Sequence, residues 1–95
     1  MSEPPVALTI AGSDSGGGSG LQADLRTFAA HSVHGVCAVT AVSAQNTEEF
    51  RSVLSIPKKE LEAQIEAVLH DFDVKATKTG LLLSEENIQL IAKMA

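Results

Sequence analysis

The stretch Ala7-Leu-Thr-Ile-Ala-Gly-Ser-Asp-Ser-Gly-Gly-Gly-Ser-Gly-Leu-Gln-Ala-Asp-Leu25 contains a strand pattern, a glycine-rich segment and a helical pattern in succession. The apolar, β-branched run over 6–10 predicts a strand that breaks into a loop at Gly12. Four of the seven glycines lie within 16–20, and a helical pattern begins at the last of them. Such a turn directs backbone N–H groups toward one point, which suits an anionic or polar ligand. A glycine-rich connector between packed elements is the alternative interpretation.

The composition indicates a small globular protein. The chain has 95 residues, 44% of them hydrophobic and 20% charged, which allows one domain at most. Its net charge of −5, with no concentration of lysine or arginine, argues against a nucleic-acid surface. The single cysteine, Cys37, excludes an internal disulfide and is expected to be a buried thiol. The chain shows neither a targeting signal nor a membrane-spanning run, so we expect a soluble, cytoplasmic protein.

Strand and helix patterns alternate along the rest of the chain. The predicted elements are a helix from about Gly20 to His31, a strand over 36–44, an extended piece over 51–56, a helix after Pro57, a strand over 74–79, and a helix capped by Ser84. The extended piece is either an edge strand or a flap. Alternation of this kind builds a mostly parallel α/β sheet with right-handed crossovers.

The helical pattern near the C-terminus continues up to the final residue. Three or four strands would also leave an apolar sheet edge uncovered. We therefore expect residues 1–95 to be the N-terminal portion of one larger α/β domain. The open edge predicts a homo-oligomer or another association through that edge.

Polar residues follow two of the predicted strands. Gln45-Asn46-Thr47 follows the strand over 36–44, and Gly12-Ser13 follows the first strand. Ligands of open α/β sheets bind at the carboxyl ends of the strands. The glutamine amide offers a donor beside an acceptor, which matches the edge of an aminopyrimidine, although the pattern alone does not select this ligand.

Asp24 is the second candidate side chain. At about 100° per residue it falls at the edge of the buried helical stripe, and we expect it to face back toward the glycine loop. Stabilisation of the helix dipole is the alternative role for a carboxylate at this place. The glycines fit neither the P-loop nor the dinucleotide spacing. No spacing of metal-ligating residues occurs, so no metal site is expected in this chain.

The stretch over 7–25 resembles the opening of the hydroxymethylpyrimidine/phosphomethylpyrimidine kinases of thiamine biosynthesis. Ala44-Gln-Asn-Thr47 and Thr77-Lys-Thr-Gly-Leu81 resemble the next two blocks of that family, in the same order and spacing. The resemblance covers essentially the whole chain. It implies a three-layer, ribokinase-like α/β fold. It also implies phosphorylation of 4-amino-5-hydroxymethyl-2-methylpyrimidine and then of its monophosphate, with ATP and Mg²⁺.

The resemblance also implies roles for individual residues. Gln45 and Asp24 become the side chains that bind the pyrimidine. Gly12 becomes backbone in close approach to the substrate, and Gly80 and Leu81 become part of the pocket wall. A related branch phosphorylates pyridoxal or pyridoxine, and its Ala-Gln-Asn block differs, so Gln45 favours the pyrimidine.

The family's Gly-Thr-Gly-Cys anion hole, catalytic cysteine and ATP-binding segments have no counterpart in this chain. We therefore assign no catalytic residue here, and expect ATP and Mg²⁺ to be held mainly by residues beyond Ala95. The 95 residues alone are expected to transfer no phosphate. A non-catalytic module that holds the pyrimidine, or docks a partner through its open edge, is the alternative, and a pyridoxal-type kinase is a third.

Overall fold

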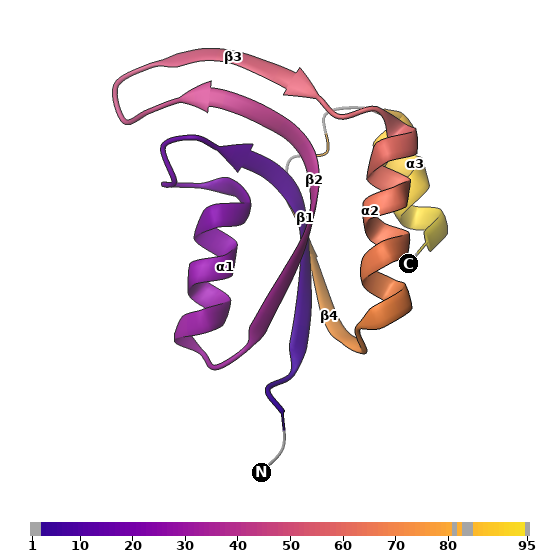
Figure 1. The fold of residues 1–95 in the computed structure, drawn as a ribbon. Coiled ribbons are helices and arrows are strands. Elements are labelled where there is room, and N and C mark those ends of the chain that lie inside the picture. The colour runs from indigo at the N-terminus through magenta and orange to yellow at the C-terminus, as the bar shows by residue number, and fades with distance from the viewer. Residues whose placement is uncertain (1–2, 81, 83–84, 95) are drawn as a thin grey trace.

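A four-stranded sheet lies between one helix on one face and two helices on the other (Figure 1). The computed structural model describes residues 3–80, 82 and 85–94. In chain order the elements are β1 (Val6–Asp14), α1 (Gly20–Ala30), β2 (His34–Gln45), β3 (Phe50–Ser55), α2 (Lys58–Asp71), β4 (Val74–Thr79) and α3 (Glu85–Met94). The predicted three-layer α/β arrangement is confirmed.

The strand order is β3-β2-β1-β4, so the first strand of the chain lies inside the sheet. β1 pairs in parallel with both β2 and β4, whereas β3 returns antiparallel to β2. The parallel pairs require crossovers, and α1 and α2 supply them on opposite faces of the sheet (Figure 1). The carboxyl ends of β1, β2 and β4 therefore meet at one edge.

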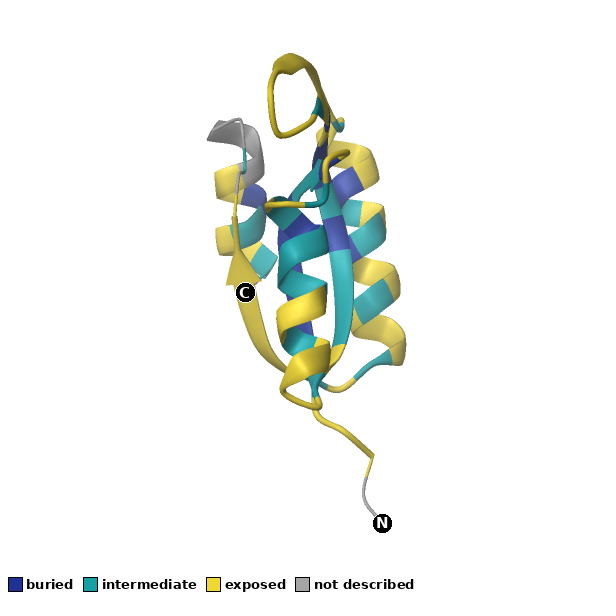
Figure 2. Cartoon of the chain, turned by 90° about the vertical axis from the view of Figure 1, so that its left-hand side faces the viewer, coloured by how far each residue is buried: buried dark blue, intermediate teal, exposed yellow. Residues whose placement is uncertain are grey.

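The core lies on the face that α2 and α3 cover. Leu61 and Ile65 of α2 are at most 2% exposed, because their spacing of four places both on the inner side of the helix. They pack with apolar residues of the sheet and of α3; the buried cluster comprises Leu8, Ile10, Ala38, Leu61, Ile65 and Leu90. The outer faces of the helices are exposed, and so is most of β4 (Figure 2).

Two strands differ from the sequence-based expectation. The predicted break at Gly12 is wrong, because β1 continues to Asp14 with a register shift between Ala11 and Ser13. The long β2 provides partners for the extra residues. Residues 51–55 of the expected extended piece lie in β3, an antiparallel edge strand whose residues are all exposed, and Ile56 follows the end of the strand. The expected helix cap at Ser84 lies outside the described residues.

Cys37 lies in β2 and is partly rather than fully buried. Burial raises the pKa of its thiol, so the thiol stays protonated near neutral pH.

In the part of the chain that the structure describes, we find no helix both long and apolar enough to cross a membrane.

Candidate functional site

A cavity of about 390 Å³ opens where β1, β2 and β4 end. Three residues predicted at the site, Gly12, Gln45 and Gly80, line this cavity. The remaining lining residues come from β1, the glycine loop, β2, β3 and β4; they are Ala11, Ser13, Asp14, Ser19, Gly20, Ala41, Ser43, Phe50, Val53 and Lys78. Of the other two predicted site residues, Asp24 is described below, and Leu81 lies outside the described residues.

The glycine loop is shaped by Asp14, which the sequence analysis did not single out. Its Oδ1 accepts from the Gly16 N–H at 2.8 Å, and its Oδ2 accepts from the N–H and the hydroxyl of Ser19, each at 2.9 Å. Hydrogen bonds from Ser19 and Gly16 lower the pKa of this carboxyl. The loop therefore directs these N–H groups to its own carboxylate. An aspartate two residues before a glycine is the local signal for such a turn.

Gly20 fixes how closely α1 approaches β1. Its φ is +66°, and a Cβ at this residue would lie 2.4 Å from the carbonyl oxygen of Gly12. The first turn of α1 also holds the strand end, because Gln22 accepts from the Asp14 N–H at 2.9 Å and donates to the Ser13 hydroxyl at 2.7 Å. The backbone of α1 at Gly20 therefore lies directly against the backbone of β1 at Gly12.

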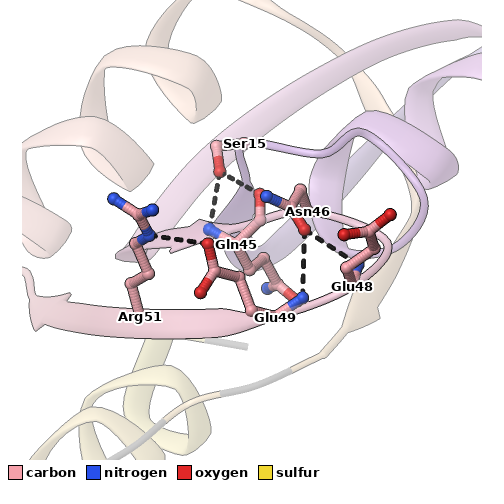
Figure 3. A network of polar contacts seen from close by, with 6 residues as sticks. All are labelled: Ser15, Gln45, Asn46, Glu48, Glu49 and Arg51. Carbon is pink, nitrogen blue, oxygen red and sulfur yellow. Dashed lines mark hydrogen bonds and ion pairs between the residues drawn. The ribbon is translucent and has the colours of Figure 1, made fainter.

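Gln45 lies at the cavity and is held through both its backbone and its side chain (Figure 3). The Ser15 hydroxyl donates to the Gln45 carbonyl at 2.5 Å and accepts from the Gln45 N–H at 2.8 Å. The Gln45 Nε2 donates to the Ser43 hydroxyl at 2.7 Å, and that hydroxyl donates to the Ser13 carbonyl at 2.8 Å. The loop after β1 and the end of β2 therefore form one connected wall.

The turn between β2 and β3 brings apolar side chains to the same cavity. Asn46 Oδ1 accepts from the N–H groups of Glu48 and Glu49, at 2.8 and 3.0 Å (Figure 3). The antiparallel return then pairs Phe50 with Gln45. Phe50 lines the cavity although it is 61% exposed overall, so β3 contributes an apolar side to a polar site.

Asp24 is oriented differently from the prediction. Its Oδ2 accepts from the Thr9 hydroxyl at 2.7 Å and its Oδ1 from Lys78 Nζ at 2.6 Å, so it faces β1 and β4 rather than the glycine loop. It is not among the described residues that line the cavity, but Lys78 is. Burial opposes ionisation of Asp24, yet the hydrogen bonds from Lys78 and Thr9 and the charge of Lys78 lower its pKa.

Lys78 is a cavity residue that the sequence analysis missed. It lies inside the block Thr77-Lys-Thr-Gly-Leu81, one residue before the end of β4. A lysine close to the carboxyl end of a predicted strand was the available signal. Among residues 3–80, 82 and 85–94, no group of three or more His, Cys, Asp or Glu side chains is arranged to hold a metal ion.

The mostly parallel sheet of this chain, with helices on both faces, matches solved structures of ribokinase-like vitamin kinases. The family model described as phosphomethylpyrimidine kinase matches residues 14–95. The chain therefore belongs to the phosphomethylpyrimidine kinase family.

Individual relatives agree with this assignment. A hydroxymethylpyrimidine/phosphomethylpyrimidine kinase of Synechococcus elongatus is 57% identical over 88 residues, which are 93% of this chain and 34% of the relative. The crystal structure of phosphomethylpyrimidine kinase from Clostridium difficile 630 matches with a TM-score of 0.90 and 46% identity, over 94% of this chain and 38% of that one. An ADP complex of Bacillus subtilis pyridoxal kinase matches with a TM-score of 0.88 and 40% identity, over 95% of this chain and 36% of that one. The chain spans about a third of the length of these relatives.

Proposed function

We propose that this chain forms the acceptor-substrate side of a thiamine-pathway kinase that phosphorylates 4-amino-5-hydroxymethyl-2-methylpyrimidine and its monophosphate. The observation that carries the proposal is Gln45 at the cavity, in a chain of the phosphomethylpyrimidine kinase family. A glutamine amide presents a donor and an acceptor side by side. These groups complement the ring nitrogen and exocyclic amine of an aminopyrimidine.

The rest of the cavity suits a flat heteroaromatic ring. Gly12 and Gly80 contribute wall without side chains, so a ring can approach the backbone closely. Phe50 and Val53 contribute apolar surface, which a ring can cover. Gln45, Gly12 and Gly80 are therefore the proposed contacts with the base. Asp24 is not a described lining residue of the cavity, and we propose that it acts through Lys78, to which it is hydrogen-bonded.

The nucleotide and the metal ion are proposed for the whole protein, because this chain spans about a third of the length of its relatives. ADP is bound in the Bacillus subtilis pyridoxal kinase relative, and we propose ATP with Mg²⁺ as the phosphate donor here. Among the described residues, no acidic side chains gather into a metal site, and the Asp14 carboxylate is already occupied by hydrogen bonds from the glycine loop. We therefore derive no step through the nucleotide or the metal from this chain.

The test compares two ligands in two variants. We expect the chain to bind the pyrimidine alcohol more tightly than pyridoxal in calorimetric titrations. Gln45→Ala should lower the affinity for the pyrimidine by about tenfold, since a paired polar contact of about 1.4 kcal/mol is lost. Thr47→Ala is the matched control, because Thr47 is exposed in the adjacent turn and does not line the cavity. Equal losses for both ligands in Gln45→Ala would contradict the proposal.

A pyridoxal-type kinase is the second candidate, favoured by the 40% identity to the Bacillus subtilis pyridoxal kinase. Tighter binding of pyridoxal than of the pyrimidine by the unaltered chain would support it. A non-catalytic module remains the other alternative. That this chain alone transfers no phosphate stays a prediction, and turnover above background in a coupled ATPase assay with the pyrimidine alcohol would contradict it.

We also propose a cytoplasmic location, an association of copies through the open edge of the sheet, and no role for nucleic acid or membrane. The outer strand β4 supports the association, because five of its six residues are exposed. Sedimentation of the purified chain as a monomer over a range of concentrations would contradict it.

A further inference from the structure

Lys78 lies at a junction of three elements. It is the register partner of Thr9 in the parallel pair of β4 and β1. These two strands lie side by side in the sheet (Figure 1). Register partners of adjacent strands point to the same face of a sheet, and the face here is the one that α1 covers. Asp24 of α1 contacts both residues, at 2.7 Å from the Thr9 hydroxyl and 2.6 Å from Lys78 Nζ.

The Asp24 carboxylate is held in position by a second hydrogen bond, from Thr9, in addition to its contact with Lys78. Thr9 is completely buried, and its hydroxyl donates to Oδ2, which leaves Oδ1 directed at Lys78. The Asp24 side chain is 12% exposed and that of Lys78 is 54% exposed. The second ion pair of β4, between Lys75 and Asp73, has side chains that are 64% and 82% exposed. Lys78 is thus paired with a carboxylate that is mostly buried, whereas Lys75 is paired with an exposed carboxylate at the surface.

The position of Lys78 gives the cavity a cation. Among the described lining residues two carry charge at neutral pH, Asp14 and Lys78. Asp14 is occupied by hydrogen bonds from Gly16 and Ser19. An ammonium has three N–H donors, and one contact with Asp24 accounts for one of them. The remaining donors suit an anionic oxygen of a ligand in the cavity.

We propose that Lys78 binds the phosphate of a phosphorylated acceptor in this cavity, and that Asp24 and Thr9 are positioning residues that hold its ammonium there. This inference rests on the proposed function, because it concerns the second of the two acceptors. The pyrimidine alcohol is neutral, so a cation contributes little to its binding. The monophosphate carries a negative charge, so it gains a charge-assisted hydrogen bond.

The first test measures how the chain distinguishes the two acceptors. Calorimetric titration with the pyrimidine alcohol and with its monophosphate gives the ratio of their affinities. Lys78→Met should lower the ratio of monophosphate to alcohol affinity by about tenfold or more, since a charged hydrogen bond is removed. Lys75→Met, on the same strand, should leave the ratio within about twofold. Equal ratios in the unaltered chain and in Lys78→Met would overturn the inference and leave the proposed function standing.

The positioning role has its own readout. Asp24→Asn and Thr9→Val should each lower the affinity ratio in the unaltered background. Both should have no effect on the ratio when combined with Lys78→Met, because the residue that they position is gone. A loss of ratio that persists in the Lys78→Met background would overturn the positioning role. Circular dichroism confirms that each variant is folded before its titration is interpreted.

Inorganic phosphate separates the inference from the proposed function. Phosphate should produce saturable shifts of the Gly12 and Gly80 amide resonances in the unaltered chain and in Lys75→Met, and these shifts should be lost in Lys78→Met. Absent shifts in the unaltered chain, or equal shifts in the two lysine variants, would overturn the phosphate role of Lys78. Failure of the pyrimidine alcohol to bind, with phosphate shifts that depend on Lys78, would contradict the proposed function alone.

Discussion

Two regions beside the cavity each contain a carboxylate, Asp14 buried and Asp24 partly buried, and the two carboxylates have different roles. In the glycine loop, Asp14 accepts hydrogen bonds from Gly16 and Ser19, which are two and five residues away along the chain. At the junction of β1, α1 and β4, Asp24 accepts from Thr9 and Lys78, which are 15 and 54 residues away. The first carboxylate fixes the path of the backbone. The second fixes the position of a charge.

This difference separates the shape of the cavity from its electrostatics. Carboxylate oxygens that accept hydrogen bonds from backbone N–H groups hold a turn at a defined distance from the sheet. Such oxygens are already engaged within the protein and are poorly available to a ligand. A carboxylate paired with a lysine that lines the cavity sets where a cation stands. Variants in the glycine loop should therefore act on folding, whereas variants at the junction should act on ligand choice.

The largest effect is expected at Gly20, where the loop enters α1. Gly20→Ala would place a Cβ 2.4 Å from the Gly12 carbonyl oxygen at a φ of +66°. The loop must then move away from β1, and we expect the free energy of unfolding to fall by more than about 2 kcal/mol. Urea denaturation followed by circular dichroism measures the loss.

Gly18→Ala is the matched control for that variant. A Cβ at Gly18 would meet one atom, Asp14 Oδ2, at 4.0 Å, which is ordinary contact. We expect its stability to stay within about 0.5 kcal/mol of the unaltered chain. Comparable losses in the two alanine variants would show that the close approach of Gly20 to Gly12 does not fix the loop.

Acidification should weaken the glycine loop through Asp14. Hydrogen bonds from Ser19 and Gly16 lower its pKa from the ordinary 3.8, so its stabilising contribution is complete above that value. The contribution is lost as the pH falls through the lowered pKa, because the protonated carboxyl is a poorer acceptor. Asp14→Asn should destabilise the chain near neutral pH and flatten the stability curve at acid pH.

Urea denaturation between about pH 7 and pH 2 measures this dependence. Asp73→Asn is the control, because its carboxylate is exposed and pairs with Lys75 at the surface. A stability curve of Asp14→Asn with the same acid slope as the unaltered chain would contradict the role of Asp14.

The sequence predicts the elements well because their signals are local. The apolar residues Leu61, Ile65, Val68 and Leu69 recur at helical spacing and predict α2, and the glycines over 16–20 predict the turn before α1. Gln45 and Gly12 were expected at a common edge because the carboxyl ends of parallel strands coincide, and both line the cavity. Their contact with a ligand stays a prediction.

Features that depend on distant partners escaped the sequence analysis. The end of β1 at Asp14 depends on the register with Ser43, which no local pattern reports. The helical spacing places Asp24 on one side of α1, but its direction is decided by Lys78 on another strand. Asp14 is an exception, because its partners Gly16 and Ser19 are close in sequence and its spacing from Gly16 is a local signal.

The smallest effect on folding is expected at the junction. Asp24→Asn keeps an oxygen that can accept from Thr9 but removes the charge that faces Lys78. Lys78 is 54% exposed, so solvent screens the pair, and we expect a loss of about 0.5–1 kcal/mol in the free energy of unfolding. The loss should be smaller than that of Asp14→Asn, because the Thr9 hydroxyl keeps its acceptor and the half-exposed Lys78 ammonium can be solvated instead.

Salt dependence distinguishes this loss from a packing defect. If the charge of Asp24 stabilises the junction through Lys78, the difference between Asp24→Asn and the unaltered chain should shrink as sodium chloride is raised from about 0.05 to 1 M. Lys78→Met should show the same dependence, and the two losses should not add in the double variant. A loss in Asp24→Asn that is independent of salt and adds to that of Lys78→Met would mean that the carboxylate serves α1 rather than the cation. The contrast between the two aspartates would then disappear.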